Sequence, residues 1–189
     1  MILNAKLDIT TVRLKTKRLY LRPWQDADLA DFYEYARVDG VGQMAGWLPH
    51  GSMEFSRGIL SSFIEGKKVF ALEYEGKAIG SLGVETYKER EFPELAPLLG
   101  REIGYVLSKD YWGRVLMPEA VNAVLEWLFL EEKLDFVTVG HFVWNHQSRR
   151  VIEKCGFRFV KEVKHETRYE TVEDCLVYIL TKEEYLNRE

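Results

Sequence analysis

Cysteine is scarce in this sequence: only Cys155 and Cys175 occur among 189 residues. Small secreted domains held by disulfides carry more, so we expect two free thiols in a reducing compartment. No apolar run approaches the roughly 20 residues that a transmembrane helix requires. The amino-terminal segment also lacks the basic start, apolar stretch and cleavage site of a secretory signal. We therefore expect a cytoplasmic protein with no membrane partner.

A basic excess is missing too, because 26 Lys and Arg residues face 30 Asp and Glu residues. Proteins that bind nucleic acid usually present a basic face, so we expect no nucleic-acid partner. The four histidines show no zinc-type spacing with cysteine or carboxylate, and we expect no metal site. No repeat or linker divides the chain, which indicates a single domain over residues 1–189.

Hydrophobic periodicity and turn residues predict the elements of this domain. Strands are expected at Arg18–Pro23, Val69–Tyr74, Ala78–Tyr87, Arg101–Leu107, Asp135–Val143, Phe157–Val163 and Thr171–Leu180. Helices are expected at Asp26–Arg37, Met53–Gly66, the second half of Tyr111–Phe129 and Asn145–Cys155. This order indicates an α/β (α+β) domain whose mixed, mostly antiparallel sheet is flanked by helices, with one parallel crossover between Arg101 and Val143.

The segment Tyr111–Phe129, YWGRVLMPEAVNAVLEWLF, joins a strand to a helix through a tight turn. Pro118 suits a first helical turn. The backbone N–H groups at the start of such a helix bind anions. Val115 is the difficulty for a phosphate site, because a glycine there would let the backbone approach the anion most easily.

Four segments together resemble the GNAT superfamily of acyl-CoA N-acyltransferases, and within it the RimJ/RimL-type branch of ribosomal-protein N-acetyltransferases. They are KTKRLYLRPW (Lys15–Trp24), GWLPHGSMEF (Gly46–Phe55), REIGYVLSKDYWGRVLMPEAV (Arg101–Val121) and NHQSRRVIEKCGF (Asn145–Phe157). The resemblance implies the GNAT fold with a splayed pair of parallel strands at the cofactor site. It also implies acetyl-CoA as the acyl donor, with no metal.

The phosphate turn of this family has a Gln/Arg-x-x-Gly-x-Gly/Ala pattern, which falls here on Trp112–Met117. Val115 replaces the central glycine. Either the turn keeps a negative φ there, with the valine side chain pointing away, or phosphate binding is weakened, and we expect the first. The resemblance places the cofactor against Tyr105, Val106, Leu107, Trp112, Gly113, Arg114, Val115, Leu116, Met117, Asn145, Ser148 and Arg150. Asn145 could equally be an ordinary helix N-cap.

Glu102 is the candidate general base, since it lies about where family members carry a carboxylate that deprotonates the amine through water. Its alternative role is an exposed charge at a strand start, or an ion-pair partner for a neighbouring arginine. Many family members use a tyrosine to protonate the leaving thiolate, but that position is Ile152 here. Ser148 matches a serine proposed as the substitute, or is simply a polar residue in a first helical turn.

The acceptor is expected to be a primary amine, either a protein or peptide N-terminus or a small molecule. Trp47, His50, Glu85 and Tyr87 are the candidate acceptor-binding residues, although a loop packed on the core would explain the first two equally well. Two rival interpretations are a non-catalytic acyl-CoA sensor and a scaffold that has lost the cofactor. The resemblance implies a monomer or a homodimer.

Overall fold

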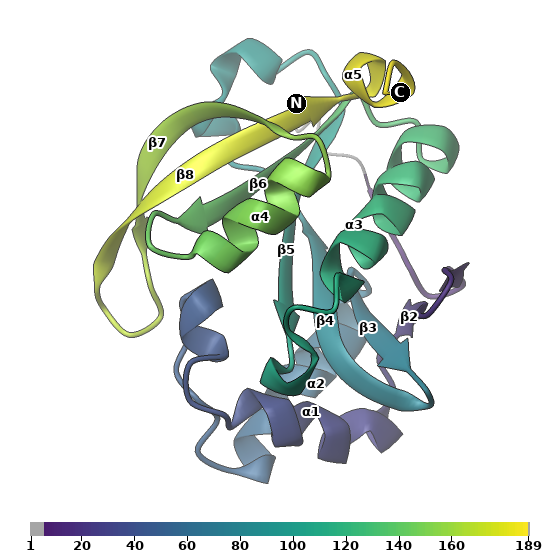
Figure 1. Ribbon diagram of the computed structural model, residues 1–189, viewed down its shortest axis with the longest axis vertical. Helices are drawn as coiled ribbons and strands as arrows, with labels where there is room; N and C mark the ends of the chain where they lie inside the picture. The colour runs from purple at the N-terminus through teal and green to yellow at the C-terminus, as the bar shows by residue number, and fades with distance from the viewer. Residues whose placement is uncertain (1–5, 189) are drawn as a thin grey trace.

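One eight-stranded sheet forms the centre of the computed structural model, which describes residues 6–188 (Figure 1). The strands are β1 (Leu14–Lys15), β2 (Tyr20–Pro23), β3 (Val69–Tyr74), β4 (Lys77–Glu85), β5 (Gly100–Leu107), β6 (Phe136–Phe142), β7 (Arg158–Glu166) and β8 (Val172–Thr181). Their order in the sheet is β1-β2-β3-β4-β5-β6-β8-β7. Only β5 and β6 pair in parallel among the described strands, which confirms the predicted mixed, mostly antiparallel α/β architecture.

The α-helices are α1 (Leu29–Ala36), α2 (Met53–Gly66), α3 (Leu116–Glu126), α4 (His146–Lys154) and α5 (Lys182–Leu186). Short 3-10 turns include Gly42–Ala45 and Lys109–Tyr111, and α3 continues as a π-helical turn at Trp127–Glu131. Ser52 caps α2 as its residue type predicts, because its hydroxyl accepts the N–H of Phe55 at 3.1 Å. Pro118 does lie in the first turn of α3. Among residues 6–188, no helix is both long and apolar enough to cross a membrane.

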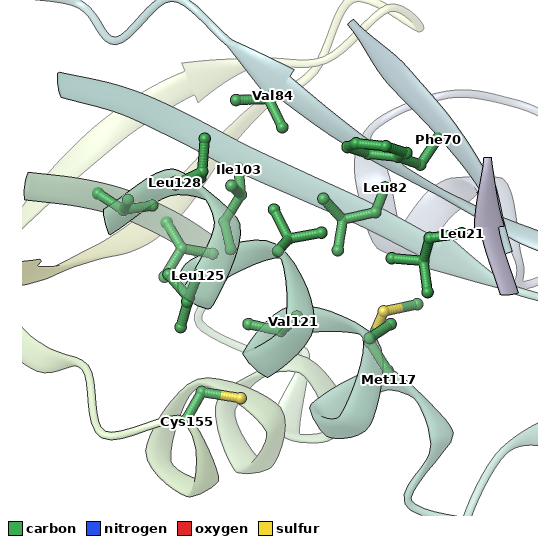
Figure 2. Packing of buried hydrophobic residues seen from close by; sticks show 14 of the residues in the cluster. Leu21, Phe70, Leu82, Val84, Ile103, Met117, Val121, Leu125, Leu128 and Cys155 are labelled. Atoms are coloured by element: carbon green, nitrogen blue, oxygen red, sulfur yellow. The ribbon is translucent and has the colours of Figure 1, made fainter. Parts of the chain in front are cut away.

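The core lies on both faces of the sheet. On one face, α3 and α4 pack over the strands, and Figure 2 shows Met117, Val121 and Leu125 of α3 directed at the sheet. The predicted apolar stripe of this helix is fully buried: Ala120, Val121, Val124, Leu125, Leu128 and Phe129 are each at most 1% exposed. On the other face, α1 and α2 pack against a second cluster that includes Ala71 and Ala78.

The turn of the β3–β4 hairpin is one residue shorter than predicted. Glu75 and Gly76 form it, with φ of +50° and +81°, and Lys77 already pairs with Tyr74. Two positive φ values fit the twist of a two-residue hairpin turn. Tyr87, expected in the second strand, follows its end at Glu85. β1 and α5 were not predicted, since both are too short to show periodicity.

Candidate active site

A cavity of about 480 Å³ lies where β5 and β6 separate. The parallel ladder joins Gly100–Phe136 through Ile103–Val139, and β5 then continues to Leu107. Past Ile103, no ladder joins the two strands within residues 6–188. Unpaired backbone groups on such an edge can pair with an extended ligand, as an added strand would.

Most of the predicted site residues surround this cavity. Those that line it are Glu102, Tyr105, Val106, Leu107, Trp112, Gly113, Val115, Leu116, Met117, Asn145, Ser148 and Arg150. They come from β5, from the turn before α3 and from α4, three segments that are distant in sequence. Arg114 does not line the cavity; its guanidinium lies 4.9 Å from the centre of the Tyr111 ring.

The backbone of Val115 contradicts the prediction of a negative φ. Its φ is +60° and its ψ is +23°, the left-handed conformation that usually favours glycine. Val115 is nevertheless 48% exposed, at the edge of the cavity that it helps to line. The prediction was wrong because the local sequence does not reveal what holds the two carbonyl groups on this turn.

Arg18 holds them. Its Nη1 donates to the carbonyl oxygen of Arg114 at 2.9 Å, and its Nη2 donates to that of Val115 at 3.3 Å. Glu119, in the first turn of α3, orients this guanidinium by accepting from its Nε at 2.8 Å. The same carboxylate accepts from the Thr16 hydroxyl at 2.5 Å. The segment before β2 therefore fixes the turn before α3, and no local sequence pattern indicates this link.

With its carbonyl groups occupied by Arg18, the turn leaves its N–H groups available. The N–H of Trp112 bonds to the Lys109 carbonyl at 3.2 Å. From Gly113 to Met117, no backbone N–H donates to another group within residues 6–188. Gly113, Val115, Leu116 and Met117 all line the cavity. A row of free donors at a helix N-terminus is a site suited to phosphate.

The Trp112 side chain secures the other end of this turn. Its indole Nε1 donates to the carbonyl oxygen of Leu107 at 2.8 Å, so it links the turn to the last residue of β5. The ammonium of Lys109 lies 5.8 Å from the centre of the Trp112 ring. The turn is thus held from both sides while its donors remain free.

The start of α4 forms the opposite wall of the cavity. Asn145 caps this helix, because its Oδ1 accepts the Ser148 N–H at 3.0 Å, and its Nδ2 donates to the Met44 carbonyl at 3.1 Å. The Ser148 Oγ lies 2.9 Å from the Tyr105 hydroxyl, which joins α4 to β5 across the cavity. Burial raises the pKa of Tyr105, so this phenol stays protonated at neutral pH. The pair is a source of hydrogen-bond donors inside the cavity.

Glu102 is partly buried on β5 rather than exposed at a strand start. Burial raises the pKa of this carboxyl, and the carboxylates of Glu91 and Glu85 raise it further, whereas Lys88 lowers it. A carboxyl with a raised pKa in a cavity is the arrangement that suits a general base.

The four candidate acceptor residues do not line this cavity. Trp47 and His50 line a second pocket of about 290 Å³. Glu85 forms an ion pair with Lys68. Tyr87 is buried, with its ring 4.9 Å from that of Phe136. An acceptor role for any of these residues stays a prediction.

Several residues that were not predicted also line the cavity, among them Met44, His165 and Cys175. Burial raises the pKa of the Cys175 thiol to about 11, and the charge of Glu102 contributes to this increase. Alternation in the predicted strand Thr171–Leu180 could have placed Cys175 on a face with Val177. It could not have shown that this face borders the cavity.

The sheet, the cavity at its splayed strands and the donor-rich turn define an α/β domain built like the N-acyltransferases. The family model for the acetyltransferase (GNAT) domain matches residues 18–158. The chain therefore belongs to the GNAT acetyltransferase family, as the resemblance of its motifs predicted.

Individual relatives agree with this assignment. A probable N-acetyltransferase, YjcK, of Bacillus subtilis (strain 168) is 44% identical over 55 residues, a match of 29% of this chain and only 30% of that protein. The crystal structure of a GNAT-family acetyltransferase from Bacillus anthracis has a TM-score of 0.79 at 23% identity, covering 91% of this chain and 99% of that one. RimJ of Mycobacterium smegmatis, in complex with CoA-disulfide, has a TM-score of 0.71 at 21% identity, covering 94% and 88%. At these identities, the structural matches show a shared fold.

Proposed function

We propose that this chain transfers an acetyl group from acetyl-CoA directly to a primary amine, on a protein N-terminus or a small molecule. The GNAT family uses acetyl-CoA as its donor. The observation that carries the proposal is the row of free N–H donors from Gly113 to Met117, which opens onto the same cavity as Glu102 and Ser148.

In this proposal, the donors of the turn bind the diphosphate of acetyl-CoA. Arg150 lines the same cavity and supplies a positive charge for the phosphates. The pantetheine arm then runs along the open edge of β5, where Tyr105, Val106 and Leu107 offer main-chain groups. This placement brings the thioester toward Glu102. Holding both reactants in one cavity supplies much of the rate through proximity.

The amine nitrogen attacks the thioester carbonyl carbon, so that a C–N bond forms and the C–S bond breaks. Glu102 accepts the proton that the amine loses, through a water molecule. Its raised pKa makes it a stronger base than an ordinary glutamate. Backbone donors of β5 stabilise the negative charge that develops on the carbonyl oxygen.

Ser148 donates a hydrogen bond to the departing thiolate of coenzyme A. In this role the Ser148 Oγ uses its own proton, and the Tyr105 hydroxyl, 2.9 Å away, would donate to the Oγ in turn. Hydrogen bonds to a charged group contribute about 1.5–3 kcal/mol. We therefore assign Ser148 to the leaving group, while Asn145 holds the helix start that carries it.

Direct transfer is favoured over a covalent acyl-enzyme by the state of the two thiols. Burial raises the pKa of Cys155 to about 12 and that of Cys175 to about 11, and both are free. A thiol is nucleophilic only as the thiolate, and neither cysteine ionises appreciably near pH 7.

The test combines binding and turnover. Acetyl-CoA at about 100 times its Kd should stabilise the fold by about 2.7 kcal/mol, which raises the Tm of a domain of this size by roughly 5–10 °C. A panel of peptides with free N-termini and of small amines should then show free-thiol release together with acetylated product by mass spectrometry. A Tm shift without any product would instead identify a non-catalytic sensor.

The Ser148→Ala variant probes the leaving-group role. We expect kcat to fall roughly 10–150-fold, the equivalent of a lost charged hydrogen bond, with the Kd for acetyl-CoA changed much less. Ser62→Ala, on an exposed serine of α2 whose hydroxyl donates to the Ile59 carbonyl, is the matched control and should change neither. Unchanged turnover in Ser148→Ala would contradict the assignment.

A further inference from the structure

A second pocket, of about 290 Å³, is formed by the loop before α2, by α2 itself and by the β7–β8 hairpin. Its walls are Trp47, Leu48, Pro49, Phe55, Ile59 and Arg168, with His50 among them. The His50 ring lies 5.0 Å from that of Trp47 and 4.9 Å from that of Phe55. The pocket is therefore an aromatic and aliphatic enclosure with a guanidinium group at its edge.

The apolar residues of this pocket are more exposed than packing on the core would require. Leu48 is 55% exposed and Phe55 is 56% exposed. Single exposed apolar residues are ordinary, but a cluster around a hollow marks an interaction site.

Arg168 gives the pocket a single positive charge. It is exposed, and within residues 6–188 no carboxylate lies within ion-pair distance of its guanidinium. His50 adds no charge at neutral pH, because burial, and then the neighbouring Arg168, lower its pKa. Its Nδ1 is already 2.7 Å from the Ser56 hydroxyl. An apolar hollow beside one unpaired guanidinium matches an apolar group followed by a carboxylate.

The same two chain segments contribute residues to both pockets. Met44 and Ala45 line the main cavity, while Trp47, two residues later, lines the second pocket. On the facing hairpin, His165 lines the main cavity and Arg168 lines the second pocket. The backbone N–H of Arg168 donates to the backbone carbonyl oxygen of Gly46 at 2.8 Å, and this bond joins the two segments between the pockets. An extended chain with its amine beside Glu102 would cross this wall into the second pocket.

We propose that the second pocket binds a side chain of a peptide acceptor, specifically an apolar or aromatic residue that is followed by an acidic one. This inference rests on the proposed acetyl transfer to an N-terminal amine and narrows its substrate class to peptides. A small amine would fill the main cavity alone and leave the pocket without a role. The apolar side chain enters between Trp47 and Phe55, and the acidic one pairs with Arg168.

The test uses peptides with a free N-terminus that differ only in one dipeptide: Phe-Glu, Phe-Gln, Ala-Glu or Ala-Gln, placed in turn at positions two to six. At one placement, kcat/KM for Phe-Glu should exceed that for Ala-Gln at least tenfold. Arg168→Gln should remove the preference for Glu over Gln and keep that for Phe over Ala. Phe55→Ala should remove the preference for Phe over Ala and keep that for Glu over Gln. Arg13→Gln removes the same charge from an exposed position outside the pocket and should change neither preference.

Failure of this inference is distinguishable from failure of the proposed function. If all peptides are acetylated equally, the pocket does not select the acceptor, although the acetyl transfer stands. If no amine is acetylated, fluorescence polarisation of the labelled Phe-Glu peptide decides separately, and absence of binding overturns the inference. If the pocket variants only convert a dimer to a monomer in ultracentrifugation, a second copy covers the pocket and the inference is wrong.

Discussion

Removing the Arg18 side chain tests how the turn at Val115 is held. A non-glycine residue in a sparsely populated backbone region costs about 1–3 kcal/mol. Arg18 opposes this cost with two hydrogen bonds to the carbonyl groups of Arg114 and Val115. A charged donor contributes about 1.5–3 kcal/mol to such a bond. We take the lower value of about 1.5 kcal/mol for each bond, because the Arg18 side chain is 38% exposed. The two bonds together then contribute about 3 kcal/mol, which offsets the backbone strain at Val115.

Without Arg18, the strain at Val115 is unopposed, and the turn should relax toward negative φ and misalign its N–H donors. We expect Arg18→Ala to raise the Kd for coenzyme A about tenfold, or about 1.4 kcal/mol. Glycine takes a positive φ without strain, although its flexibility offsets part of the gain by about 0.5–1 kcal/mol. Val115→Gly alone should therefore leave the affinity similar or slightly improved. In that background, Arg18→Ala should raise the Kd less than about threefold.

Isothermal titration of coenzyme A into the four proteins of this cycle gives the coupling between the two positions. Lys17→Ala removes an adjacent exposed charge and is the matched control, with no expected change in Kd. Equal losses from Arg18→Ala in the unmodified protein and in the Val115→Gly variant would refute the reasoning, since Arg18 would then act independently of the backbone at this position.

Two further predictions concern Glu102 and the core. Burial raises the pKa of Glu102, so the contribution of this carboxyl to folding stability is fully present below the ordinary glutamate pKa and is lost as the pH rises through the raised value. Glu102→Gln, whose amide stays neutral, should therefore raise the Tm at pH 7 while lowering kcat. A lower Tm would contradict this. Leu125→Ala removes a side chain with 0% exposure and should lower the free energy of unfolding by about 2–5 kcal/mol in urea denaturation. Leu130→Ala, at a site 39% exposed, should stay within about 0.5 kcal/mol, and equal losses would contradict the packing argument.

Much of the fold could be predicted because its elements carry strong local patterns. The stripe of α3 repeats over three turns, and the Ser52 cap and the glycine-containing hairpin turn each follow from one or two residues. The strands at the edges were harder to bound. β7 extends to Glu166, three residues beyond its predicted end, because its pairing with β8 rather than its own sequence determines its length.

The site was predictable where its residues follow one another in sequence. The turn and the start of α4 were found from such segments and do line the cavity. The backbone of Val115 was not predictable, because it depends on Arg18, 97 residues away. Trp47 was assigned to the acceptor site from its loop alone, whereas the path of that loop turns its side chain toward a separate pocket.

The parallel pairing of β5 with β6 also bears on how the chain folds. The β3–β4 hairpin closes through a two-residue turn, whereas Leu99 and Asp135, next to the first β5–β6 pair, bond across 36 residues. Contacts of such separation carry a larger loop-closure entropy and form late. We therefore expect the cleft to be assembled after the hairpins, and the coenzyme A of the proposed function would then bind only a chain in which β6 has already docked. The ligand would accordingly slow unfolding far more than it accelerates folding.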